Sequence, residues 1–198
     1  MFNPGELNEK ITVLTLNQGG NTYTWKESSK LWAKVEQLNK TNIFSKVGLG
    51  AKSIKFTIRK NKDLTLHNAF IWRGKHCFLT DIFEVDRAYY EVTAALIEPV
   101  TCVVERCGEP TKDKLNRPVY SEQILISFPG VLTEKYMSYM QNEPMATTEM
   151  RYVLVTPKAI EINCGELVTI NGTTYNVLIA HTLDEYKNEY EILYQGDI

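Results

Sequence analysis

Two stretches of this chain have the same pattern: Ile71-Trp72-Arg73-Gly74-Lys75-His76-Cys77-Phe78 and, ninety-eight residues later, Thr169-Ile170-Asn171-Gly172-Thr173-Thr174-Tyr175-Asn176. Each predicts a β-hairpin, because Arg-Gly and Asn-Gly can supply the positive φ angles of a two-residue turn. An aromatic strand is predicted after each hairpin, at Tyr89-Tyr90-Glu91-Val92-Thr93-Ala94 and at Glu189-Tyr190-Glu191-Ile192-Leu193-Tyr194. Few residues are identical between the halves, so the repeat is one of pattern. It predicts two small β units in tandem, which more often assemble or bind than catalyse.

The composition is that of a folded protein. A length of 198 residues suits one or two domains, and 43% hydrophobic with 11% aromatic residues predicts packed cores rather than disorder. No apolar run approaches the roughly 20 residues of a membrane-spanning helix. The first residues lack a basic segment followed by an apolar one, so we expect no secretory signal.

The charge is divided unevenly along the chain. The net charge of −2 and a pI of about 6.0 argue against a protein whose main task is to grip nucleic acid. Residues 1–99 hold 14 Lys and Arg against 10 Asp and Glu, whereas residues 100–198 hold 8 against 14. This division has two interpretations: two differently solvated surfaces, or a polar molecule with an acidic neighbour at one end and a basic neighbour at the other.

Alternation of apolar and polar residues predicts short strands in the same order in both halves. A long excursion interrupts each half, at residues 38–52 and at residues 135–149, and Glu98-Pro99 marks the boundary between the halves. The predicted fold class is all-β, with two tandem small β-barrel or sandwich domains, residues 1–99 and 100–198, that have long inter-strand loops. The predicted strands are residues 11–16, 31–37, 54–59, 102–106, 128–134 and 151–156, with a turn at residues 17–21 and a polar loop at residues 112–118.

The sequence holds no familiar catalytic motif, neither Gly-x-Ser-x-Gly nor His-Glu-x-x-His. Gly48-Leu49-Gly50-Ala51-Lys52-Ser53 is superficially similar to a phosphate-binding loop. It lacks a glycine directly before the lysine and precedes a strand, so we reject it. Glu185, Glu189 and Glu191 stand among aromatic residues, which predicts a half-exposed strand rather than an acid–base pair. We therefore expect no enzyme activity.

The cysteines and histidines do not predict a metal site. Cys77, Cys102, Cys107 and Cys164 lack the paired Cys-x-x-Cys spacing of zinc sites, and without an export signal reduced thiols are the default. His76 and Cys77 are adjacent on a predicted strand, where neighbouring side chains point to opposite faces, so they would not share a metal. We expect neither a metal nor another cofactor.

Five segments of the first half, taken in order and spacing, carry a resemblance to a known family. They are Asn3-Pro4-Gly5-Glu6-Leu7-Asn8-Glu9-Lys10-Ile11-Thr12-Val13, Trp32-Ala33-Lys34-Val35, Phe56-Thr57-Ile58-Arg59, Ile71-Trp72-Arg73-Gly74-Lys75 and Tyr90-Glu91-Val92-Thr93-Ala94. Together they resemble the phage head–tail adaptor family, the small head-completion or stopper proteins of long-tailed phages. Phe128-Pro129-Gly130-Val131-Leu132-Thr133-Glu134-Lys135-Tyr136 and residues 186–190 more loosely resemble small connector proteins from the same phage gene neighbourhood.

The resemblance implies a structural role in the virion, after synthesis in the cytoplasm of the bacterial host. It implies a β-barrel subunit in a homo-oligomeric ring of about six or twelve copies. That ring would close the DNA-filled head, with a portal or adaptor protein on one side and a tail terminator or tail protein on the other. Packaged DNA would occupy its channel, and no membrane is involved. This chain is longer than the usual member, which leaves ring size and stacking open.

In this family the long loop after the Trp-Ala-Lys-Val strand lies towards the channel and can act as a gate. Here that loop is residues 38–53, which hold three lysines and no acidic residue. The alternative is a plain solvated loop. The candidate channel or gating residues are Lys40, Lys46, Gly48, Gly50 and Lys52, and the interaction candidates in the second loop are Tyr136, Met137, Tyr139 and Met140.

Other functions remain open at this stage. The chain could form another ring of the same stack, such as a tail-completion or collar protein, which differs only in the neighbours that it touches. It could instead be a nucleic-acid-binding β-barrel module, although the acidic second half argues against that function. An enzyme ranks last.

Overall fold

The computed structural model describes residues 4–38, 52–107, 110–112, 114–115, 117–120, 123–134 and 151–195. These residues form fourteen strands and one 3₁₀ turn, η1 (Pro4–Glu6), with no α-helix among them, so the predicted all-β class is confirmed. The strands are β1 (Glu9–Gly19), β2 (Thr22–Gln37), β3 (Lys52–Arg59), β4 (Asn68–Trp72), β5 (Lys75–Glu84), β6 (Tyr89–Ile97), β7 (Val100–Cys107), β8 (Pro110–Lys112), β9 (Pro118–Tyr120), β10 (Gln123–Glu134), β11 (Arg151–Pro157), β12 (Leu167–Ile170), β13 (Thr173–His181) and β14 (Lys187–Tyr194).

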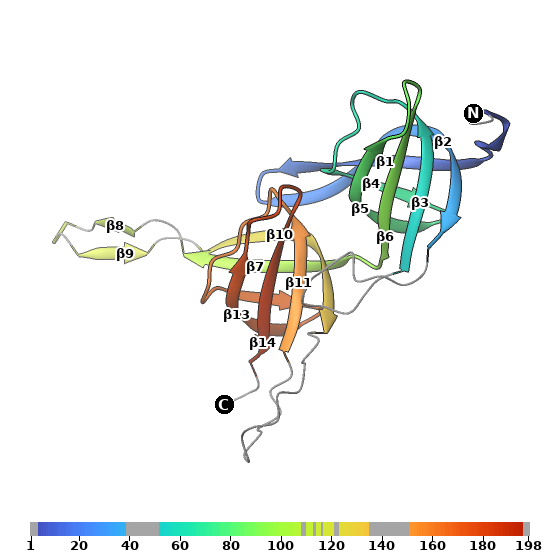
Figure 1. Ribbon diagram of the computed structural model, residues 1–198. Coiled ribbons are helices and arrows are strands. Elements are labelled where there is room, and N and C mark those ends of the chain that lie inside the picture. The colour runs from blue at the N-terminus through green and yellow to red at the C-terminus, as the bar shows by residue number, and fades with distance from the viewer. Residues whose placement is uncertain are drawn as a thin grey trace, which may run out of the picture.

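Twelve of these strands belong to one large sheet, in which the strand pairings close into two cycles (Figure 1). The first cycle has the order β1-β4-β5-β6-β3-β2, and β2 pairs back with β1. The second cycle has the order β7-β12-β13-β14-β11-β10, and β10 pairs back with β7. Every pairing inside the two cycles is antiparallel, and a short parallel pairing of β2 with β10 joins them. Strands β8 and β9 form a separate hairpin that projects from the second cycle (Figure 1).

The two cycles repeat each other in register as well as in order. Arg73 and Asn171, the first turn residues of the two hairpins, both have a φ of 50°, and a glycine with positive φ follows each. A bulge follows at Leu79/Asp81 in β5 and at Val177/Ile179 in β13, again ninety-eight residues apart. The pattern repeat seen in the sequence is therefore a repeat of backbone structure.

Each cycle encloses its own cluster of buried apolar side chains. Phe56 of β3 faces Val92 of β6 in the first cycle, and Leu154 of β11 faces Tyr190 of β14 at the equivalent place in the second. All four are fully buried. Packing around Leu154 is tight, because a Cβ atom on Gly130 would lie only 2.8 Å from Leu154 Cδ1.

The hairpin of β1 and β2 is longer than predicted. The sequence predicts a turn at residues 17–21. In the structure the two strands stay paired as far as Gly19 and Thr22, with one bulge after Val13. The two strands have 11 and 16 residues, against about 5–6 for a common strand. Outside the cycle this ribbon carries polar residues on both faces, so its sequence lacks the alternation that marks a half-buried strand. Likewise, the predicted polar loop at residues 112–118 includes the ends of β8 and β9.

The prediction of a half-exposed strand around Glu189 and Glu191 is wrong. Their exposed fractions are 4% and 5%, whereas Glu185 is exposed. Both buried carboxylates have cationic or imidazole neighbours: Glu189 pairs with buried Lys187, and Glu191 lies 3.2 Å from His181 Nε2. A buried charge is tolerated when it is paired and hydrogen-bonded, and that pairing cannot be inferred from polarity alone.

His76 is a buried histidine of β5 that makes stability depend on pH. Its ring lies 5.5 Å from that of Trp25, and its Nε2 has no hydrogen-bond partner among the described residues. Burial lowers the pKa of His76 from 6.5 to about 4. The folded state therefore keeps the ring neutral after the unfolded chain has bound a proton, so protonation favours unfolding as the pH falls.

We expect the free energy of unfolding to fall by about 2–3 kcal/mol between pH 6.5 and about pH 4 on account of His76. Urea titrations across this range should show a shallower pH dependence in His76→Phe, which has no proton to bind. An equal slope in the two proteins would contradict the assignment.

Candidate functional site at the junction of the two cycles

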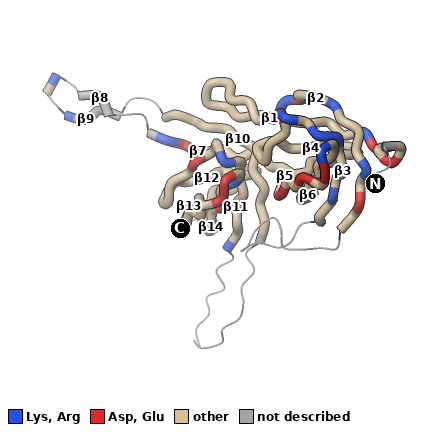
Figure 2. Tube along the Cα trace, turned by 45° about the horizontal axis from the view of Figure 1, so that its top comes forward, with Lys and Arg blue, Asp and Glu red and all other residues tan. Residues whose placement is uncertain are grey.

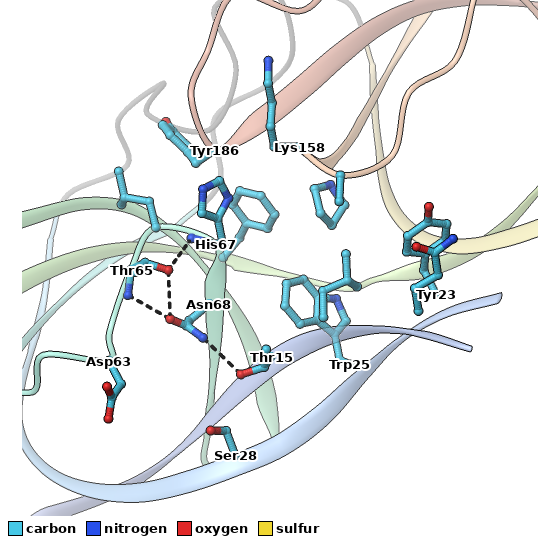
Figure 3. Close-up of a pocket in the computed structure, with 16 residues that line it drawn as sticks. Thr15, Tyr23, Trp25, Ser28, Asp63, Thr65, His67, Asn68, Lys158 and Tyr186 are labelled. Atoms are coloured by element: carbon cyan, nitrogen blue, oxygen red, sulfur yellow. Dashed lines mark hydrogen bonds between the residues drawn. The ribbon is translucent and has the colours of Figure 1, made fainter. Parts of the chain in front are cut away.

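A pocket of about 530 Å³ lies where the two cycles meet (Figure 3). The β1–β2 hairpin contributes Tyr23 and Trp25, and the first residue of β4 contributes the side chain of Asn68. The second cycle contributes Lys158, just after β11, and Tyr186, just before β14. Residues far apart in the sequence therefore converge on this pocket.

The side-chain amide of Asn68 ties one wall of the pocket together. Its nitrogen donates to the backbone oxygen of Leu14 and to Thr15 Oγ1, both at 3.2 Å. Its oxygen accepts from the backbone N–H of Thr65 at 2.8 Å and from the Thr65 hydroxyl at 3.2 Å. The amide is buried, and these bonds satisfy both its donor and its acceptor side. The segment before β4 is thereby fixed to β1.

The opposite wall belongs to the second cycle. The Tyr186 ring lies 6.3 Å from that of Phe78, across the junction, and burial raises the pKa of Tyr186 to about 12. The backbone oxygen of Tyr186 accepts from the N–H of Lys158 at 3.2 Å, and Lys158 Nζ donates to the Thr182 oxygen at 2.5 Å. In Figure 3 the Lys158 side chain points away from Asn68. The polar groups of this wall therefore brace the second cycle itself.

Beside the pocket runs a continuous apolar seam, to which both cycles contribute. Burying a side chain of this size stabilises by about 1.5–3 kcal/mol, so the seam is a substantial contact. Its buried members are Phe78, Ala95 and Ile97 of the first cycle and Val131, Val153 and Val155 of the second, with Tyr186 packed against them.

The outer part of the β1–β2 hairpin, residues 16–25, is called here the first arm, and it reaches onto the second cycle (Figure 1). Leu16 and Tyr23 pack against the second core. The backbone oxygen of Asn21 accepts from the N–H of Ser127 at 2.9 Å, and Thr22 pairs with Ser127 in parallel. Arm and seam together hold the two cycles in one arrangement.

This arrangement can hold the two cycles together. The hydrogen bonds of Asn68 and Lys158 described above brace its two walls. Within the described ranges, no three His, Cys, Asp or Glu side chains gather as metal ligands would. No helix in those ranges is long and apolar enough to cross a membrane.

Most residues predicted as functional from the sequence lie elsewhere. Lys52 is exposed at the start of β3, opposite Leu96 of β6. The N–H of Leu38 donates to the Ser53 oxygen at 3.0 Å, so the end of β2 and the start of β3 lie side by side. The remaining candidates lie outside the described residues: Lys40, Lys46, Gly48 and Gly50 of the first loop and Tyr136, Met137, Tyr139 and Met140 of the second.

Lys52 belongs to a basic hollow that the sequence did not predict. Arg73 and Lys75, from the first hairpin, line the same hollow of about 430 Å³. Arg73 also pairs with Glu9, and that hydrogen bond lowers the pKa of the Glu9 carboxyl. Lys, Arg, Asp and Glu are interleaved over the first cycle (Figure 2). The hollow could have been foreseen only from the cyclic pairing, which brings the hairpin beside the start of β3.

The junction residues Trp25, Asn68, Lys158 and Tyr186 were also missed. A signal for Trp25 existed, since the aromatic pair Tyr23 and Trp25 alternates with threonine well before the predicted strand at residue 31. Nothing local marks Asn68 or Lys158, because their role arises from contacts between distant segments.

Neither a known protein family nor a curated protein matches this chain.

Proposed function

We propose that this protein is a structural virion component that forms a ring at the head–tail junction of a tailed phage. The ring closes the head, connects the portal to the tail and retains the packaged DNA. The observation that carries the proposal is the duplicated cycle, in which two six-stranded units of one order and register are locked together by an arm and an apolar seam. The placement at the head–tail junction rests on the resemblance of residues 3–96 to head–tail adaptors.

A duplicated, braced subunit suits a connector because it presents two similar units to two different neighbours. The first half is net basic and the second net acidic. The first half therefore favours an acidic neighbour and the second half a basic one. The basic hollow of Lys52, Arg73 and Lys75 is the part of the first cycle best suited to lie near DNA phosphates in the channel. About six or twelve copies around an axis would concentrate that charge.

We also infer that each cycle is a separate small β-barrel domain, with the boundary at Glu98 and Pro99. Closure removes the unpaired edges that an open sheet would expose. Each cycle has its own apolar cluster, and only two residues link β6 to β7.

Deleting the coding sequence from the phage or prophage that carries it tests the proposed function. We expect heads that leak DNA or fail to join tails, with the defect reversed by supplying the protein in trans. Mass spectrometry of purified wild-type particles should find several copies of the chain in each. Normal yields of infectious, DNA-filled particles from the deletion would overturn the proposal.

A further inference from the structure

The second cycle has a projecting ribbon of its own, formed by the part of the repeat just before the first arm and sharing with it only the outermost pair. Strands β7 and β10 continue to pair beyond β12, from Glu105 with Leu125 to Cys107 with Gln123. In the repeat, these pairs are equivalent to Leu14 with Glu27 and Leu16 with Trp25 of the β1–β2 hairpin. We call residues 105–107 with residues 123–125 the second arm.

The second arm carries apolar side chains where the first hairpin carries charges. Ile124 and Leu125 occupy the places of Lys26 and Glu27. Their exposed fractions are 38% and 58%, and as neighbours on a strand they project to opposite faces of the ribbon. Apolar residues on both faces of a projecting ribbon are expected where another surface covers it.

The site that receives the first arm also has a counterpart. The first arm lies on β10 at Ser127, beside a small cavity that Phe128 lines. In the repeat, Lys30 and Leu31 of β2 take the places of Ser127 and Phe128. Among the described residues no strand pairs with this edge of β2 at Lys30, since β3 pairs only from Ala33 onwards.

A groove is present at this counterpart. It has a volume of about 470 Å³, and its lining includes Leu31 and Trp32, the latter 57% exposed. Leu7, Lys30 and Arg59 complete the lining. Lys30 already pairs with Glu27 at 3.7 Å, whereas Arg59 faces a groove whose proposed occupant carries exposed Glu105, so these two charges are complementary.

We propose that the second arm of one copy docks in the Leu31–Trp32 groove of another copy. The groove is the counterpart of the place on β10 where the first arm lies, and the second arm supplies exposed apolar side chains to cover it. Because arm and groove are different surfaces, the association is head-to-tail, and it continues until the rotation between copies closes a ring. This docking deepens the proposed function and rests on it, since it names the surfaces by which copies of the connector associate.

Sedimentation velocity of the purified full-length chain over a concentration series tests the docking. The wild type should associate as its concentration rises, and Leu125→Lys and Trp32→Lys should each weaken association by at least about tenfold, as for a central interface contact. Leu183 lies outside both the second arm and the groove, and its side chain is 100% exposed, so Leu183→Lys should have no effect on association. Circular dichroism verifies folding, and Leu125→Gln and Trp32→Gln replace any variant that fails to fold.

A mixture of the two lysine variants gives the sharpest result. Each variant keeps one intact surface, so the mixture should form one-to-one dimers and nothing longer, at concentrations where each variant alone stays monomeric. A wild type that is monomeric at every concentration would overturn the docking, and so would association that Leu183→Lys weakens as much as Leu125→Lys. In that last case copies still associate and the proposed function stands. Absence of the protein from purified particles would instead overturn the proposed function, leaving the sedimentation result to decide the docking.

Discussion

Phe56→Ala is expected to lower the free energy of unfolding of the first cycle by about 3–5 kcal/mol. The Phe56 side chain is fully buried at the centre of that cycle. Its ring meets those of Phe70 and Trp72 edge-on, at centroid distances of 5.4 Å and 6.2 Å. Truncation removes these contacts and leaves a cavity that rigid neighbouring strands cannot fill. Urea titration followed by Trp fluorescence measures the loss.

The same variant tests whether the cycles are separate domains. Leu154→Ala is the matched change, because Leu154 occupies the equivalent place in the second cycle and should cost about 2–5 kcal/mol. If the cycles are separate domains, calorimetry shows two transitions, and each variant shifts only one of them. A single transition that both variants shift equally would contradict two domains and would mean that the seam couples the cycles into one folding unit.

The parts of the fold that local chemistry specifies were predictable from the sequence. Arg73-Gly74 and Asn171-Gly172 marked both hairpins because a two-residue turn needs positive φ, and both turns have it. The alternation in residues 54–59 likewise marked β3. The length of the β1–β2 hairpin was not predictable, because its outer pairs are stabilised by contact with the second cycle rather than by local alternation.

The junction was beyond sequence reasoning for a physical reason. Phe78, Val131 and Tyr186 meet only after both cycles have closed, and each alone resembles an ordinary strand or turn residue. Of the predicted loop residues, only Lys52 falls among those that the structure describes, and its neighbours Arg73 and Lys75 come from another part of the repeat. Strand pairing across a cycle, rather than spacing along the chain, selects such neighbours.

The buried charges of β14 lead to the other large effect. Glu189→Leu is expected to lower the free energy of unfolding by about 3–5 kcal/mol, because it removes the carboxylate that neutralises Lys187 inside the protein. The two side chains are each only 5% exposed and are paired directly. The Asp184 carboxylate also lies 3.7 Å from the ammonium group, but it is 42% exposed, so it compensates weakly. Urea titration at neutral pH measures the change.

A double variant separates the charge from the packing. Lys187→Met should also be costly, since it leaves the Glu189 carboxylate buried without the ammonium group. Lys187→Met with Glu189→Leu should recover most of the loss, because two apolar side chains of similar volume need no desolvation of charge. The coupling between the two sites then measures the pair directly. Additive losses would mean that each side chain is held by other contacts, and the ion pair would not be what makes burial of these charges tolerable.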